Sequence, residues 1–273
     1  GKLLDSAERV VKKMAASAWD PNWQHRHVAI LAEFSDIYAA TGNITKQSEM
    51  AQKALQASRD LIAKYPAQPG FRRALWVSYG KAAVAEFTGG NYAAALDYWG
   101  AGMDTIQSLA SEFPSSSRYA RDVAITHASI GRIQLDMGRS ESALESFGSC
   151  LLIRRKLSAA EPENIDLLRE VALCISSEGD ALAAMSRTTE AQDSYRSAVE
   201  LFRHLADLQP DALHTKYLLS VALQHWAILL LRDDKRPEAE AYTLECNTLR
   251  RELAREDPSE IGWKEPCQHS MSR

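Results

Sequence analysis

GRSESALESFGSCLLIRRKLSAAEP, residues 138–162, recurs in altered form at a fixed spacing along the chain. Gly90–Pro114 begins 48 residues earlier, and Ser186–Pro210 begins 48 residues later. The prolines that end these segments belong to one series with the same step: Pro66, Pro114, Pro162, Pro210 and Pro258. Self-similarity at a period of 20–50 residues is typical of solenoids, in which each repeat packs on its neighbours.

Each repeat has the pattern of two helices. In the first half, apolar residues return at helical spacing, as at Leu219, Leu223 and Leu230. A glycine then marks the end of this helix at 42, 90 and 138, because a left-handed residue commonly terminates a helix. The second half runs to the phased proline, which cannot continue a helix interior. Strand and hairpin signals are scarce, so the sequence predicts an all-α fold.

This pattern predicts a single array over residues 1–273. The expected units are residues 22–66, 67–114, 115–162, 163–210 and 211–258, with partial helices at 3–18 and 259–273. The array opens and closes in the middle of a unit, whereas solenoid ends normally carry polar caps. We therefore hypothesise that the chain is part of a longer protein, or that something else covers its ends.

The composition and charge of the chain argue against some classes of binding partner. The net charge is −4 and both signs are mixed along the chain, which argues against a nucleic-acid or membrane partner. No apolar run approaches the roughly 20 residues that a membrane span needs. The four cysteines show no CxxC spacing and no adjacent histidine cluster, so we expect reduced cysteines in a cytoplasmic protein.

The repeat resembles the tetratricopeptide repeat. A small residue stands within each first helix (Ser35, Ala83, Gly131, Gly179 and Ala227), and an aromatic residue stands in three second helices (Trp99, Phe147 and Tyr195). The unit is about 14 residues longer than the 34-residue motif, and is similar to the long repeats of bacterial multidomain signalling proteins. The resemblance implies a right-handed superhelix of about five helix pairs, whose first helices line a concave groove.

The same resemblance implies which residues line the groove. They are Arg73, Val77, Gly80, Val84, Phe87, Arg121, Ile125, Ala128, Arg132, Leu135, Arg169, Leu173, Ser176, Asp180, Ala183, Val221, Gln224, Ile228 and Leu231. This lining suits an extended or helical segment of a protein partner with apolar anchors. In the alternative interpretation, some of these side chains pack on the neighbouring repeat.

Arg73, Arg121 and Arg169 hold one phase, and we call them the arginine ladder. Arginine matches carboxylate and phosphate geometry, so the ladder could bind an acidic partner. The alternative, which we favour, is pairing between repeats, with Arg73 meeting Asp122 and Arg121 meeting Glu170. Glu178 stands in an otherwise apolar phase, either in an open position or paired with a buried donor.

No catalytic, metal or cofactor motif is present in the sequence. The sequence therefore favours a non-catalytic protein-interaction module within a larger signalling or regulatory protein. Self-association of the array is the first alternative. An α-helical enzyme is the second, and would need acidic and histidine side chains that converge in a cleft.

Overall fold

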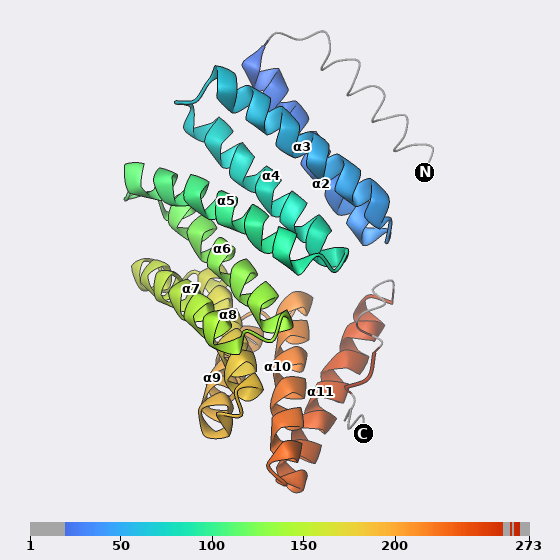
Figure 1. The fold of residues 1–273 in the computed structure, drawn as a ribbon. Helices are drawn as coiled ribbons and strands as arrows, with labels where there is room; N and C mark the ends of the chain where they lie inside the picture. Colours follow the sequence, from blue (N-terminus) through green and yellow to red (C-terminus); the bar gives the residue numbers. More distant parts are fainter. Residues whose placement is uncertain (1–19, 259–262, 264, 268–273) are drawn as a thin grey trace. The chain divides into compact units, whose positions relative to one another are not determined.

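The computed structural model describes residues 20–258, 263 and 265–267, so most of the two predicted terminal helices lies outside the described residues. The described part is built from α-helices (Figure 1), which confirms the predicted all-α class. The helices are α2 Pro21–Ala40, α3 Ile44–Lys64, α4 Pro69–Thr88, α5 Tyr92–Glu112, α6 Ser117–Asp136, α7 Ser140–Ala160, α8 Ile165–Ala184, α9 Thr188–Leu208, α10 Leu213–Arg232 and α11 Arg236–Glu256. Within these described residues, no helix combines the length and apolar character of a membrane span.

The helices repeat in the register of the sequence. The first helices start at residues 21, 69, 117, 165 and 213, and the second helices at 44, 92, 140, 188 and 236, so both series advance by 48 residues. Each phased proline stands two residues beyond the end of a second helix, for example Pro66 after Lys64. The prolines therefore terminate the second helices, because a proline ring removes a donor and clashes with the preceding turn.

The turn inside each helix pair contains one left-handed residue. Gly42, Gly90 and Gly138 have φ values of 70°, 81° and 73°. Ser186 and Asp234 hold the same place in the later repeats and keep φ values of 59° and 56°. The turn geometry is thus common to all five helix pairs described, and two of them adopt it with a residue that bears a Cβ atom.

Replacing Ser186 with glycine is expected to stabilise the protein by about 0.5–1 kcal/mol. A left-handed conformation costs a residue with a Cβ atom about 1–2 kcal/mol, which exceeds the extra entropy of glycine in the unfolded chain, about 0.5–1 kcal/mol. The reciprocal change Gly138→Ser is the matched control and should destabilise by a similar amount. Urea unfolding measures both, and a Ser186→Gly variant no more stable than the parent would contradict the strain argument.

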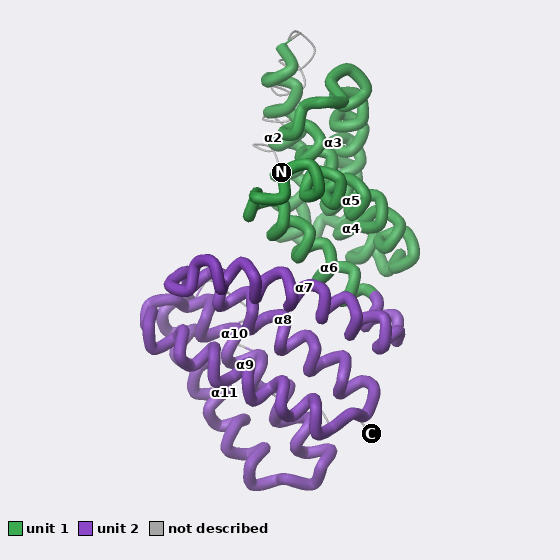
Figure 2. The backbone as a smooth tube through the Cα atoms, turned by 90° about the vertical axis from the view of Figure 1, so that its left-hand side faces the viewer, with its two compact units in different colours: residues 1–133 green, residues 134–273 purple. Residues whose placement is uncertain are grey.

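The chain forms two compact units, residues 1–133 and 134–273, with the division inside α6 (Figure 2). In the first unit α2 packs on α3, α3 on α4, and α4 on α5, and α2 also contacts α4. In the second unit each helix from α7 to α11 packs on the next, and α8 also contacts α10. Consecutive first helices within a unit therefore contact each other, as the repeat pattern requires.

Small residues admit the aromatic side chains of the second helices. A Cβ atom on Gly80 would lie 2.8 Å from the Trp99 ring, and one on Gly179 would lie 2.8 Å from the Tyr195 ring. Trp99 and Tyr195 are buried by these contacts. Gly179 belongs to the small-residue phase of the first helices and Tyr195 to the aromatic phase of the second helices, so the two phases meet in this repeat.

The expectation of reduced cysteines is wrong for this structure. Cys150 on α7 is joined to Cys174 on α8, and Cys246 on α11 is joined to Cys267. The Cα–Cα distances of 6.6 Å and 6.2 Å lie within the usual span of a disulfide. Sequence spacing hid both pairs because each forms between a second helix and the element that follows it, 24 and 21 residues along the chain.

Candidate functional site

All the predicted groove residues lie on first helices. In the first unit they are on α4 (Arg73, Val77, Gly80, Val84 and Phe87) and α6 (Arg121, Ile125, Ala128 and Arg132), and in the second on α6 (Leu135), α8 (Arg169, Leu173, Ser176, Asp180 and Ala183) and α10 (Val221, Gln224, Ile228 and Leu231). Gly80 is buried against the ring of Trp99. The other predicted groove residues are at least partly exposed, and Val84 is 44% exposed despite its apolar side chain. These residues therefore lie at surfaces of their units and are available for contacts beyond them.

Four of the predicted residues come together at a hollow in the second unit. It has a volume of about 400 Å³ and receives side chains from the end of α6 and from α8, α9 and α10. Its lining is Leu135, Asp180, Ala183, Ala184, Tyr195, His225, Ile228, Leu229 and Arg232. We call this site the α8–α10 hollow.

The polar side of the hollow is built around Asp180. The Tyr195 hydroxyl donates a hydrogen bond of 2.7 Å to Asp180 Oδ1, and His225 Nδ1 lies 2.7 Å from the same oxygen. Burial, with the nearby Asp180 charge, raises the pKa of Tyr195, so its phenol keeps the proton that it donates. This arrangement ties α8, α9 and α10 together and holds the Asp180 carboxylate at the hollow.

The rest of the lining is mostly apolar. Leu135, Ile228 and Leu229 line the hollow with large apolar side chains, whereas the small side chains of Ala183 and Ala184 leave space in it. A hollow of this kind suits an apolar side chain whose orientation is set by a few polar groups.

The α8–α10 hollow brings an acidic residue and a histidine together, as an α-helical enzyme would need. Among its described lining residues, however, there is no serine, threonine or cysteine that the Asp180–His225 pair could activate. The described residues also contain no group of three or more potential ligands placed to hold a metal ion. The geometry therefore offers positioning and binding, with no assembled nucleophile or metal centre among these residues.

Sequence reasoning missed five lining residues: Ala184, Tyr195, His225, Leu229 and Arg232. His225 follows a predicted groove position at Gln224, and it lies 45 residues after Asp180, so the two are out of phase with the 48-residue repeat. Tyr195 is one of the repeat aromatics, but nothing in the repeat pattern indicates its hydrogen bond to Asp180. Only the packing of α8 against α10 brings His225 to Asp180.

Arg73 pairs between repeats, as the favoured interpretation of the arginine ladder predicts. Its Nε and Nη2 donate to the two carboxylate oxygens of Asp122 at 2.6 Å and 3.0 Å, and these bonds raise the pKa of Arg73. The guanidinium also stacks on Trp76, whose indole N–H donates to Thr126 Oγ1 at 2.9 Å. This network joins α4 to α6 within residues 69–133.

Arg169 is also engaged. Its Nη2 lies 2.7 Å from Asp166 Oδ1, and its Nε donates to Thr215 Oγ1 at 3.1 Å, which joins α8 to α10. Arg73 and Arg169 thus each use Nε and Nη2 in contacts within their own unit. Glu170, the predicted partner of Arg121, lies 3.6 Å from Arg154 Nε.

Glu178 is half-buried on α8 and faces α7, where a Cβ atom on Gly148 would lie 3.7 Å from Glu178 Oε1. Burial raises the pKa of Glu178, and the positive charge of Arg155 offsets this only in part. The glycine thus leaves space for a carboxylate in a phase that is otherwise apolar.

Replacing Glu178 with glutamine is expected to stabilise the protein at pH 7 and to change little below about pH 4.5. An acid whose pKa is raised on folding stabilises the folded state below its unfolded pKa, and this contribution is lost as the pH rises through the folded pKa. Glutamine carries no charge to desolvate. Urea unfolding at pH 4 and pH 7 tests this, with the exposed residue Glu145 changed to glutamine as a control. A Glu178→Gln variant less stable than the parent at pH 7 would mean that the carboxylate is favourable where it lies.

No protein-family model and no curated protein sequence matches the chain. Solved structures do match the chain. The crystal structure of BtubC (BKLC) from P. vanneervenii aligns with a TM-score of 0.70 and 17% identity, covering 91% of this chain and 90% of that one. Apo RapI aligns with a TM-score of 0.56 and 13% identity over 92% and 91% of the two chains.

A third similar structure is larger. It is a signal transduction ATPase with numerous domains and a tetratricopeptide repeat sensor, from Pyrococcus horikoshii. The alignment has a TM-score of 0.57 and 14% identity and covers 90% of this chain but 36% of that one. At such low identity these alignments establish the fold. Together with paired helices in a constant register, they show that the chain has a tetratricopeptide-like repeat fold.

Proposed function

We propose that the chain is a non-catalytic protein-interaction module that binds a segment of a partner protein on its first helices. In the second unit, an apolar side chain of the partner enters the α8–α10 hollow. The hollow is the observation that carries the proposal, because four side chains predicted for the groove, Leu135, Asp180, Ala183 and Ile228, line it together.

The chemistry of the lining supports an apolar anchor with a polar neighbour. The apolar walls gain free energy when they are removed from water, by about 25 cal/mol for each Å² buried. Asp180 and His225 can orient peptide groups beside that anchor, since their side chains are 20% and 35% exposed. Asp180 is already held by Tyr195, so little further ordering is needed when a partner binds.

We further propose that the array belongs to a larger regulatory protein. The tetratricopeptide repeat of the Pyrococcus horikoshii ATPase is a sensor within a longer chain, and it has the same fold as this chain. That similarity supports the context and leaves the partner to be found by experiment.

A random peptide library displayed on phage can be selected against the purified chain. The selected peptides are expected to share a large apolar residue. Ala184 is exposed at the last position of α8 and lines the hollow, so an Ala184→Trp change should fill it without disturbing the core. We expect the peptides to bind this variant at least about tenfold more weakly, as measured by fluorescence anisotropy, a factor that corresponds to about 1.4 kcal/mol.

Ala160→Trp is the matched control, because Ala160 is the exposed last residue of α7 in the same unit and does not line the hollow. It should bind the selected peptides as the parent does. Equal binding to all three proteins, or failure to select any peptide, would remove the hollow from the proposal.

A further inference from the structure

The two disulfides are built in the same way, two repeats apart. Cys150 on α7 and Cys246 on α11 occupy equivalent positions, and each is followed four residues later by an arginine, Arg154 or Arg250. Both arginines are buried, with exposed fractions of 8% and 7%. Arg154 Nη1 donates to the backbone carbonyl of Glu170 at 2.8 Å, and Arg250 Nη1 donates to that of Glu265 at 3.3 Å. Each cysteine and arginine together hold the element that follows.

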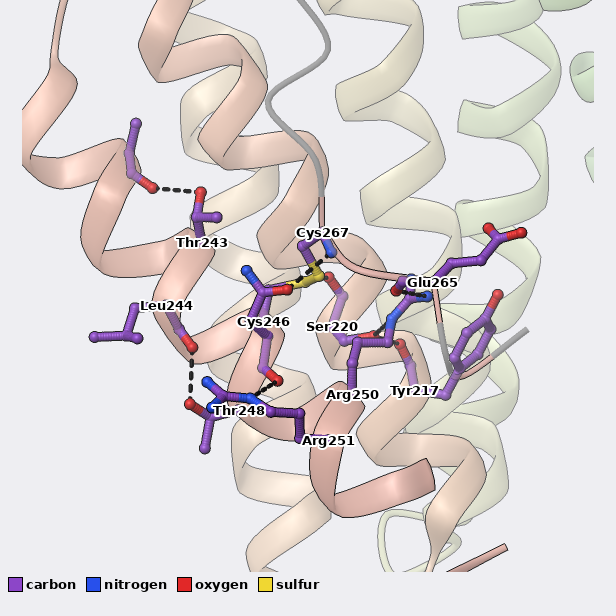
Figure 3. Close-up of a disulfide and its surroundings, with 12 residues drawn as sticks. Tyr217, Ser220, Thr243, Leu244, Cys246, Thr248, Arg250, Arg251, Glu265 and Cys267 are labelled. Atoms are coloured by element: carbon purple, nitrogen blue, oxygen red, sulfur yellow. Dashed lines mark hydrogen bonds between the residues drawn. A yellow bond between two sulfur atoms is a disulfide. The ribbon is translucent and has the colours of Figure 1, made fainter. Parts of the chain in front are cut away.

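The two disulfides differ in the segment that carries the second cysteine. Cys174 lies in the middle of α8, so its backbone is fixed by helical hydrogen bonds and by packing on α7 and α9. Cys267 lies outside any helix, in a segment where Glu265 and Pro266 are exposed. Figure 3 shows this segment crossing beside α11, with Cys267 joined to Cys246 and Arg250 pointing toward Glu265.

Hydrogen bonds from α11 supplement the disulfide in holding Glu265–Cys267. The backbone N–H of Cys267 donates to Asn247 Oδ1 at 3.0 Å, and Arg250 donates to the Glu265 carbonyl. Arg250 is itself fixed, because its Nε donates to Ser220 Oγ at 2.8 Å and its guanidinium stacks on Tyr217. Cys267 is buried, but Glu265 and Pro266 are exposed and the segment belongs to no helix, so it can open locally without unfolding α10 or α11.

We propose that Cys246–Cys267 is a thiol-reducible clasp, which a small dithiol opens in the folded protein while Cys150–Cys174 stays closed. A thiolate of the dithiol attacks Cys267 Sγ, the Cys246–Cys267 bond breaks, and Cys246 leaves as a thiolate that then takes up a proton. The second thiol of the reductant attacks the mixed disulfide and releases Cys267. Two electrons pass to the protein, and the dithiol becomes a cyclic disulfide.

Opening the clasp changes the surface of α11. A hollow of about 450 Å³ lies between α11 and the held segment, lined on the helix by residues that include Asn247 and Ala254, and on the other side by Trp263, Glu265 and Pro266. Release of Glu265–Cys267 removes Glu265 and Pro266 from this second wall and opens the hollow further along α11. The clasp thus places access to α11 under redox control, independently of the α8–α10 hollow.

The test uses the whole chain under native conditions. The protein is incubated with dithiothreitol, samples are alkylated with N-ethylmaleimide over time, and mass spectrometry measures labelling at each cysteine. We expect Cys246 and Cys267 to be labelled at least about tenfold faster than Cys150 and Cys174, because their segment opens locally. An Asn247→Ala change removes the hydrogen bond to the backbone N–H of Cys267. It should speed the labelling of Cys246 and Cys267 about fivefold, the factor that corresponds to about 1 kcal/mol, and leave the labelling of Cys150 and Cys174 unchanged.

Thr248→Ala is the matched control on the same helix, because the Thr248 hydroxyl bonds the Leu244 carbonyl of its own helix. It should leave all four labelling rates unchanged. Simultaneous labelling of both pairs, earlier labelling of Cys150 and Cys174, or labelling that requires urea would each overturn the proposal. An Asn247→Ala variant with the labelling rates of the parent would do the same, because the segment would then be held by something else.

Discussion

Replacing Arg73 with leucine is expected to destabilise the protein by about 3 kcal/mol. The change leaves the carboxylate of Asp122, which is 3% exposed, without its two charge-assisted hydrogen bonds. Breaking a buried ion pair from one side costs about 3–5 kcal/mol, and the lower end applies because the Arg73 side chain is itself 34% exposed. The stacking of the guanidinium on Trp76 is lost as well.

Urea unfolding of purified variants measures this effect. Arg187→Leu is the matched control, because Arg187 forms an exposed pair with Glu190 three residues along the chain, and exposed ion pairs contribute little to stability. Adding Asp122→Asn to the Arg73→Leu variant should restore part of the stability, because the buried charge is then removed. If Arg73→Leu costs no more than Arg187→Leu, the arginine is not needed to hold α4 against α6, and its role as a partner-binding residue becomes the better interpretation.

Replacing Gly179 with alanine is expected to destabilise the protein by about 2 kcal/mol. The added Cβ atom would lie 2.8 Å from Tyr195 Cε1 and 2.9 Å from Cδ1, and the ring is buried and hydrogen-bonded to Asp180. Overpacking costs about 1–3 kcal/mol, and the upper end applies to a buried ring that is also held at its hydroxyl. Alanine has a better helix propensity than glycine, which offsets about 1 kcal/mol of this cost and leaves the net destabilisation at about 2 kcal/mol.

Gly100→Ala is the control for helix propensity alone, because no atom lies within 4 Å of a Cβ atom at this exposed position on α5. This variant should be about 1 kcal/mol more stable than the parent. The Gly179→Ala change should also weaken binding of peptides selected for the α8–α10 hollow, since the displaced ring carries the bond to Asp180. Equal stabilisation by the two substitutions would show that the ring of Tyr195 can move away without cost.

The positions of the helices could be predicted from local signals. The phased glycines and prolines mark where the chain cannot continue a helix, and the structure ends its helices there. The resemblance to the tetratricopeptide repeat also indicated one face of the first helices, because residues about one helical turn apart share a face. Leu135, Asp180 and Ile228 were assigned to that face, and all three line the α8–α10 hollow.

Which side chains of neighbouring helices bond to each other could not be predicted in the same way. Arg73 and Asp122 are one repeat plus one residue apart, which made their pairing foreseeable. Arg169, in the equivalent position to Arg73, bonds Thr215 instead, because Leu218 stands in the position equivalent to Asp122 and offers no acceptor. Departures from the consensus therefore set the chemistry at each repeat.

The sequence by itself determined the all-α class and the 48-residue register, because these depend on backbone restrictions and side-chain periodicity within a single helix. Only the tertiary structure decided that Asp180 meets His225, that Arg169 reaches Thr215, and that Cys150 and Cys246 find their partners. Such contacts depend on how far one helix is shifted and rotated against another. A shift of one residue moves a side chain by about 1.5 Å along the helix and about 100° around it, which is enough to make or lose each of them.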